Sequence, residues 1–211
     1  MLWIALAAQI SAPLPTNMIK WFSYDDMPGY LIERAPGLWL VGIRVTVGSD
    51  GAVQSCGVES SSGTERLDEF TCKRIKQRAK FAPARAADGS AALGVYRTSV
   101  KWAVADSPFD SSNASIPDVD VSVARLPAGL KSPALVRVMF AVDAHGNISS
   151  CAAEPVQPFE RISNSPDLVP VACVQLVKIF KPVPAKDSAG NAVPSVQDAI
   201  VRFSLQNQAA R

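Results

Sequence analysis

The chain has 211 residues, of which 48% are hydrophobic, and a formal net charge of +2. This length is enough to bury one large core or two small ones. A nearly neutral chain has no global field that would attract nucleic acid or a membrane surface, and no apolar run reaches the roughly 20 residues of a membrane-spanning helix. We therefore expect a globular protein that is neither an integral membrane protein nor a nucleic-acid-binding protein.

The beginning of the chain differs from the rest. Residues 1–12 are apolar, end in Ala12 and are followed by Pro13. This pattern is typical of the apolar region and cleavage site of a secretory signal, although such signals usually begin with basic residues. The alternatives are a start codon further upstream and a hydrophobic first strand of the folded domain. We assign 1–12 as a signal-like segment, predict export, and exclude the segment from the fold.

An internal repeat organises the chain. The segment 41–56 recurs as 136–151, which is 95 residues later (136 − 41). In both copies apolar residues alternate with polar ones, which predicts a strand with one buried face. Asp-Gly at 50–51 and His-Gly at 145–146 predict a turn into a second strand. In the first copy Val53 is out of phase with Cys56, so we expect a β-bulge between them.

A helix is predicted after each hairpin, because the apolar period changes from two to about 3.6. Ser62 and Glu65 fit a capping box at the start of the first helix. Ser165-Pro166 fits the start of the second, and Pro170 is expected to delay or kink it. The apolar stripes expected to face the sheet are Leu67, Phe70, Ile75 and Ala79 in the first copy, and Leu168, Val171, Leu176 and Phe180 in the second.

Each copy ends in a third strand, 96–102 or 199–205, after a proline-containing turn. We therefore predict an α+β protein of two tandem ββαβ modules, each an antiparallel sheet packed on one helix. The first module covers 21–102, the linker 103–115 and the second, divergent module 116–207. The alternating segment 118–123 is expected to be a lead-in strand of the second module, and its counterpart in the first is 21–34.

The four cysteines occupy equivalent positions in the two copies. Cys56 and Cys151 end the second strand, whereas Cys72 and Cys173 lie on the helix that covers the sheet. We predict two disulfides, Cys56–Cys72 and Cys151–Cys173, with four buried thiols as the alternative. No metal site is expected, because the chain has no Cys-x-x-Cys pair and a single histidine. Disulfides indicate an oxidising compartment, which supports export.

Several motifs of the first copy follow one another in a fixed order. They are the Asp-Gly hairpin, Val-Glu-Ser-Ser-Ser-Gly at 58–63, the helix with Cys72, Phe-Ala-Pro-Ala at 81–84, Gly89 and a last strand that ends in Val-Lys-Trp at 100–102. In this order they resemble the TonB C-terminal domain family, in its disulfide-containing versions. The resemblance covers 21–102 closely and 116–205 more loosely, because the second copy lacks the Ser-Ser-Gly sequence.

The resemblance implies a binding domain and not an enzyme, with no cofactor and no small-molecule substrate. In this family the domain captures an extended segment of an outer-membrane receptor by strand addition at its final strand. The matching edge here is Tyr96, Arg97, Thr98, Ser99, Val100, Lys101 and Trp102, with 200–205 as a weaker counterpart. The alternative is an ordinary edge that is covered or paired within the protein. An open terminal strand is also compatible with a strand-exchanged homodimer.

No membrane anchor or proline-rich spacer precedes the first module in this sequence. We therefore expect an exported periplasmic adaptor that engages an extended peptide or protein partner, in connection with TonB-dependent outer-membrane transport. The alternative is an energy transducer proper, which delivers inner-membrane proton-motive energy to outer-membrane receptors. In that case the anchor is encoded upstream or supplied by another chain, and the protein associates with the inner membrane.

Three groups of residues suggest other chemistry. His145 aligns with Asp50 in a turn, and both residue types tolerate positive φ, so we expect a turn residue and not the base of a hydrolase. Asp25 and Asp26 are expected to cap a helix and not to form an acid–base pair. A basic cluster is expected to form a solvated face, with an anionic polymer or lipid headgroup as the alternative ligand: Lys73, Arg74, Lys76, Arg78, Lys80 and Arg85.

Overall fold

The structure is a computed structural model that describes residues 10–34, 36–104, 117–154, 162–163, 165–187 and 189–206. It is an α+β fold, as predicted. None of the described helices is long and apolar enough to cross a membrane. The elements in chain order are β1 (Leu14–Pro15), η1 (Met18–Lys20), η2 (Tyr24–Asp26), α1 (Gly29–Ile32), β2 (Gly37–Val47), β3 (Val53–Ser60), α2 (Glu65–Arg78), β4 (Phe81–Ala82), β5 (Ala84–Arg85), β6 (Ala91–Ala92), β7 (Gly94–Val104), β8 (Val119–Val123), β9 (Ala134–Val142), β10 (Ile148–Ala153), α3 (Leu168–Ile179), β11 (Ala185–Lys186), β12 (Ala192–Val193) and β13 (Ser195–Leu205).

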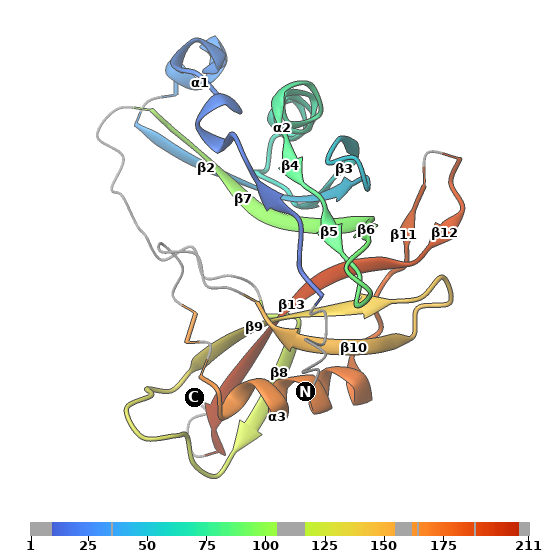
Figure 1. The fold of residues 1–211 in the computed structure, drawn as a ribbon. Helices are drawn as coiled ribbons and strands as arrows, with labels where there is room; N and C mark the ends of the chain where they lie inside the picture. Colours follow the sequence, from blue (N-terminus) through green and yellow to red (C-terminus); the bar gives the residue numbers. More distant parts are fainter. Residues whose placement is uncertain are drawn as a thin grey trace.

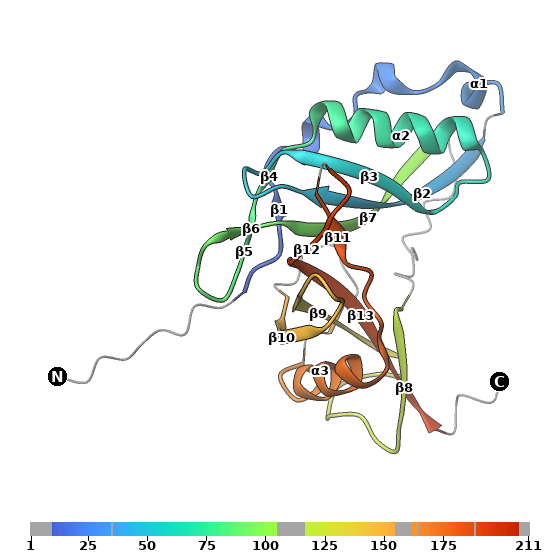
Figure 2. The ribbon, with the colours of Figure 1, turned by 90° about the vertical axis from the view of Figure 1, so that its right-hand side faces the viewer.

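In the first half, helix α2 covers one face of an antiparallel sheet in which β2 lies between β3 and β7 (Figure 2). The alternation predicted for β2 places one row of side chains in the core under α2. Leu67 and Ile75 of α2 belong to the same core and are fully buried. The buried apolar residues of β2 are Val41, Ile43, Val45 and Val47.

The second half repeats this order of elements in the same register. Strand β9 lies between β10 and β13, and α3 shares a core with them. The pair Val47↔Gly94 of the first half corresponds to Val142↔Ser195 of the second. The register of β3 shifts between Val53 and Ser55, which confirms the predicted bulge, and β10 shifts at the equivalent place, between residues 148 and 150.

A single parallel residue pair joins the sheets of the two halves. Val196 of β13 pairs with Gly94 of β7, so that the strand order is β10-β9-β13-β7-β2-β3, with β8 added to β13. Figure 1 shows α2 and α3 on opposite sides of the molecule, and each helix has its own core. Ala103 and Val104 belong to β7, which corrects the start of the predicted linker; its residues 105–115 lie outside the described residues.

Residues 10–12 belong to the fold, which corrects their exclusion in the sequence analysis. Ile10 and Ala12 are only 4% and 6% exposed and pack in a small cluster between the two halves, with Ala84, Met139 and Val196. Ser11 exchanges two backbone hydrogen bonds of 3.0 Å with Arg85. Burial of these small apolar side chains accounts for their place in the fold. The rest of the signal-like segment, 1–9, lies outside the described residues.

The lead-in segments of the two halves fold differently. Residues 18–32 form η1, η2 and α1, and place Trp21 and Leu31 in the core under α2. The predicted lead-in strand of the second half is present as β8, which pairs in parallel with the end of β13, from Val201↔Val119 to Leu205↔Val123. The two halves therefore differ at the outer edge of their final strands.

Three details of the helices differ from the prediction. Helix α2 begins at Glu65 without a side-chain cap, and the Asp68 carboxylate accepts hydrogen bonds from the serines at 61 and 62 in place of the predicted capping box. Pro170 lies in the first turn of α3, where a missing N–H costs no helical hydrogen bond, so it does not delay the helix. Val171 is 39% exposed, and Ala172 faces the core in its place.

Both predicted disulfides are present. Cys56–Cys72 links β3 to α2 with a Cα–Cα distance of 5.4 Å, and Cys151–Cys173 links β10 to α3 with a Cα–Cα distance of 5.7 Å. Each bridge therefore joins an outer strand of the sheet to the helix that covers it. Among the described cysteines none is free.

Candidate functional site

Strand β7 carries the residues that the sequence predicts as the partner-binding edge. One edge of β7 pairs along its whole length with β2, over 11 residues. On the other edge, the described strand that meets β7 is β13, at the single pair Gly94↔Val196. Beyond Gly94 the two strands diverge, and Figure 1 shows them crossing at an angle. The segment 95–104 thus forms the outer part of this sheet within the described residues.

The two faces of β7 have different surroundings. Trp102 is 4% exposed and donates a hydrogen bond of 3.0 Å from Nε1 to Thr71 Oγ1 of α2. The rings of Phe22 and Phe70 lie 5.1 and 5.7 Å from that of Trp102 and hold it in the core. Arg97 and Ser99 lie on the face of β7 opposite to Trp102, and Ser99 is exposed. The core face of β7 is therefore fixed by packing, while its other face offers polar groups.

Arg97 is engaged within the chain. Its Nη1 donates to both carboxylate oxygens of Asp118 at 2.8 Å, and its Nε donates to Glu59 Oε2 at 2.8 Å. Burial by itself lowers the pKa of Arg97, but the charges of Asp118 and Asp198 outweigh it and raise the pKa above its ordinary value. The guanidinium therefore remains charged and ties β7 to β3 and to the residue before β8.

Further polar contacts link the two halves around this arginine. Arg44 of β2 donates from Nη2 to Gln197 Oε1 of β13 at 2.9 Å. Asp118 also accepts a hydrogen bond of 2.8 Å from the amide of Ile200. Because Arg44 and Gln197 come from different halves, as do Arg97 and Asp118, these contacts fix the angle at which β13 crosses β7.

Asp198 of β13 is the most deeply buried carboxylate of this interface. Its Oδ2 lies 3.7 Å from Nε of Arg137, and its Oδ1 has no hydrogen-bond partner among the described residues. Burial raises the pKa of Asp198 to about 6, against the opposing charges of Arg137 and Arg97. The sequence gives no signal for the burial of Asp198, because the residue belongs to no motif and is a single acidic residue within a strand.

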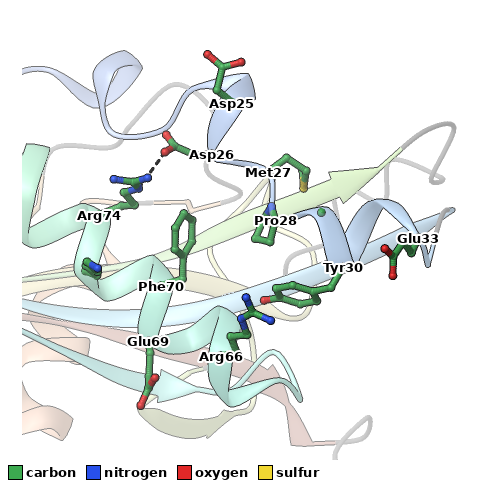
Figure 3. A pocket seen from close by; sticks show the side chains of 12 residues that line it. Asp25, Asp26, Met27, Pro28, Tyr30, Glu33, Arg66, Glu69, Phe70 and Arg74 are labelled. Carbon is green, nitrogen blue, oxygen red and sulfur yellow. Dashed lines mark ion pairs between the residues drawn. The ribbon is translucent and has the colours of Figure 1, made fainter.

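A pocket of about 620 Å³ lies between α2 and the segment with η2 and α1 (Figure 3). The Arg66 guanidinium lies 4.7 Å from the centroid of the Tyr30 ring, and that of Arg74 lies 4.9 Å from the centroid of the Phe70 ring. Four acidic and three basic side chains line the pocket, so neither sign of charge dominates it. The lining residues are Asp25, Asp26, Met27, Pro28, Gly29, Tyr30, Glu33, Arg66, Glu69, Phe70, Lys73 and Arg74.

The buried Asp26 explains part of the basic cluster. Arg74 Nε lies 2.9 Å from Asp26 Oδ1, and Arg78 forms a second ion pair with the same carboxylate. Burial by itself raises the pKa of Asp26, but hydrogen bonds from Ser23 and Arg78 outweigh it and lower the pKa. Asp26 also forms a capping box with Ser23 in η2, but both aspartates lie within this helix, and α1, which follows Pro28, has no side-chain cap. Two of the six basic residues therefore serve the fold, while Lys73 and others remain exposed.

His145 lies in the predicted turn. Its backbone N–H donates to Asp143 Oδ1 at 2.8 Å, and the next residue, Gly146, has a φ of +87°. Within the described ranges no group of three or more His, Cys, Asp or Glu side chains could hold a metal ion. The geometry at His145 is that of a turn residue.

These observations define a sheet-and-helix domain that is cross-linked by a disulfide and whose last strand lies at the outer part of its sheet. Residues 40–103 match the family model described as Gram-negative bacterial TonB protein C-terminal. This match confirms, for the part of the chain from β2 to β7, the resemblance that the sequence motifs predicted. The chain matches no curated protein and no solved structure.

Proposed function

We propose that the protein is an exported periplasmic adaptor of the TonB family, and that it binds an extended protein segment along β7. The observation that carries the proposal is the position of β7, since β2 pairs with one edge over 11 residues and, among the described strands, β13 pairs with the other edge at Gly94. Strand addition uses the backbone groups of such an edge, and side chains tune its selectivity. An outer-membrane receptor is the partner class that the family match favours.

Two further features support this proposal. The disulfides favour an oxidising compartment such as the periplasm. The fixed core face of β7, with Trp102 held by Thr71 and two rings, supplies a rigid edge, and a rigid edge loses little conformational entropy on binding. A binding role accounts for both features without any catalytic group.

We further propose that residues 116–207 form a second, divergent module of the same kind. The same register between first and last strands, the bulge at the equivalent position and the equivalent disulfide support this assignment. In this module, however, β8 already pairs with the final strand β13. We therefore assign partner binding to β7 and not to the segment 200–205.

Photo-cross-linking in periplasmic extract tests the proposed edge. A cross-linking amino acid replaces the exposed Ser99 of β7 in one variant and the exposed Gln77 of α2 in the control. We expect covalent adducts with a partner polypeptide from position 99 and none from position 77. Adducts from 77 alone, or none from 99 while the intact protein still co-purifies a partner, would contradict strand capture at β7.

A further inference from the structure

Helix α3 is apolar on the side that faces solvent as well as on the side that faces its core. Apart from the disulfide residue Cys173, its polar side chains are Gln175 and Lys178. A helix that is apolar all round is normally covered on all sides. In this chain, however, large apolar side chains of α3 and of the segment after it are 39–67% exposed. They are Val171, Val174, Val177, Ile179 and Val183.

The corresponding helix of the first half, α2, carries charge at the equivalent place. The disulfides place Cys173 of α3 where Cys72 lies in α2, which is 101 residues earlier (173 − 72). By this relation Val174 takes the place of Lys73, which is exposed on α2. The fold therefore accepts a charged side chain at this position and does not require a valine there. A row of exposed apolar side chains that the fold does not require indicates a contact with another molecule.

Charged residues at the two ends of α3 lie on the same line as the exposed valines. Asp167 directly precedes the helix, and it is followed at intervals of four, three and four residues by Val171, Val174 and Lys178. Intervals of this kind place side chains along one side of a helix, as in the seam between two packed helices. All four side chains are exposed. The row therefore begins with a negative charge, is apolar in its middle and ends with a positive charge.

Such a row is complementary to itself when two copies of the helix run antiparallel. A twofold axis between Val171 and Val174 brings each of these valines opposite the other one in the second copy, and it brings Asp167 opposite Lys178. Every contact then occurs twice, and every charge of the row meets an opposite charge. An anionic lipid surface would attract the lysine end of the row and repel Asp167. Charge complementarity therefore favours a second copy of this chain as the partner of α3.

We propose that α3 is a homodimer interface, in which the rows from Asp167 to Lys178 of two copies pack antiparallel about a twofold axis. This inference goes beyond the proposed function and does not depend on β7. Figure 2 shows α3 on the side of the second half that faces away from α2, so the contact leaves the first half of each chain uncovered. Since α3 has 12 residues and is about 18 Å long, the contact is small, and we expect a dissociation constant on the order of 0.1 mM.

Sedimentation velocity of the intact, oxidised protein at concentrations up to about 1 mM tests the association. We expect a reversible monomer–dimer equilibrium in the wild type. Val174→Glu should abolish the dimer in this range, because the contact would bury two carboxylates close to the axis. Lys73→Glu, at the corresponding position of α2, should leave the equilibrium unchanged. A photo-cross-linking amino acid in place of Val171 should give covalent dimers in which it is attached to α3 of the second copy.

Charge reversal tests the antiparallel direction. Asp167→Lys and Lys178→Asp should each weaken self-association about tenfold, since the twofold axis creates two like-charge contacts in each variant. A mixture of the two variants should form a heterodimer about as strong as the wild-type dimer, because each reversed charge again meets an opposite one. A wild type that stays monomeric, undiminished association of Val174→Glu, or a mixture no stronger than its components would overturn the inference. Binding of monomers to vesicles of anionic phospholipid, if Val174→Glu abolished it, would also overturn the inference, because α3 would then contact a membrane.

Discussion

Replacing Asp198 by asparagine should make the protein more stable at neutral pH relative to the wild type, and the gain should vanish in acid. The pKa of the buried carboxyl is raised from 3.8 to about 6. An acid with a raised pKa in the folded state favours folding when it is protonated, so its contribution falls as pH rises from about 4 through 6. A shift of about two pKa units corresponds to roughly 3 kcal/mol. Asparagine keeps the shape of the neutral carboxyl at every pH.

The assay is urea unfolding of the oxidised wild type and variant at pH 4.5 and 7.5. We expect the free energy of unfolding of Asp198→Asn, minus that of the wild type, to rise between these pH values by about 2 kcal/mol, because at pH 4.5, above the ordinary carboxyl pKa of 3.8, part of the difference is already present. Groups with lowered pKa values, such as Asp26, act equally in both proteins and cancel in this difference. Asp120→Asn, at a carboxylate whose side chain is 61% exposed, is the control and should show a nearly flat difference. A difference for Asp198→Asn that is flat or falls with pH would show that the pKa of Asp198 is not raised in the folded state.

Two other predictions concern stability. Replacing either disulfide by a pair of serines should lower the free energy of unfolding in urea by about 3 kcal/mol, since the bridges close loops of 16 and 22 residues. Equal free energies of unfolding for the oxidised and the fully reduced wild-type protein would contradict this prediction. Gly51→Ala should cost more than Gly146→Ala, by about 1–3 kcal/mol. Both glycines have positive φ, but a Cβ at 51 would lie 2.1 Å from the Phe81 carbonyl oxygen, whereas one at 146 would lie 3.4 Å from that of Pro182. Equal melting temperatures of the two variants would show that the backbone near 51 yields.

Patterns that repeat locally predicted much of this fold. The period-two alternation in 41–47 and 136–142 predicts strands because successive side chains of a strand point to opposite faces, and this holds in any tertiary context. In the second strand of the first half the alternation breaks after Val53, and this break correctly predicted the β-bulge in β3. The sequence pattern does not decide which of two neighbouring helical residues is buried. Val171 fits the apolar stripe as well as Ala172 does, and the orientation of α3 on the sheet buries Ala172.

Local sequence patterns were sufficient to predict the two halves, their strands and helices, both cysteine pairs and the relationship of 40–103 to the TonB C-terminal domain family. These features depend on residue spacing within short segments. By contrast, three contacts became visible only in the folded chain: β8 adds to β13, Arg97 binds Asp118, and Ile10 lies between the halves. These contacts join segments that are distant in the chain. Their partners are therefore selected by shape and charge across the assembled interface, which no local pattern encodes.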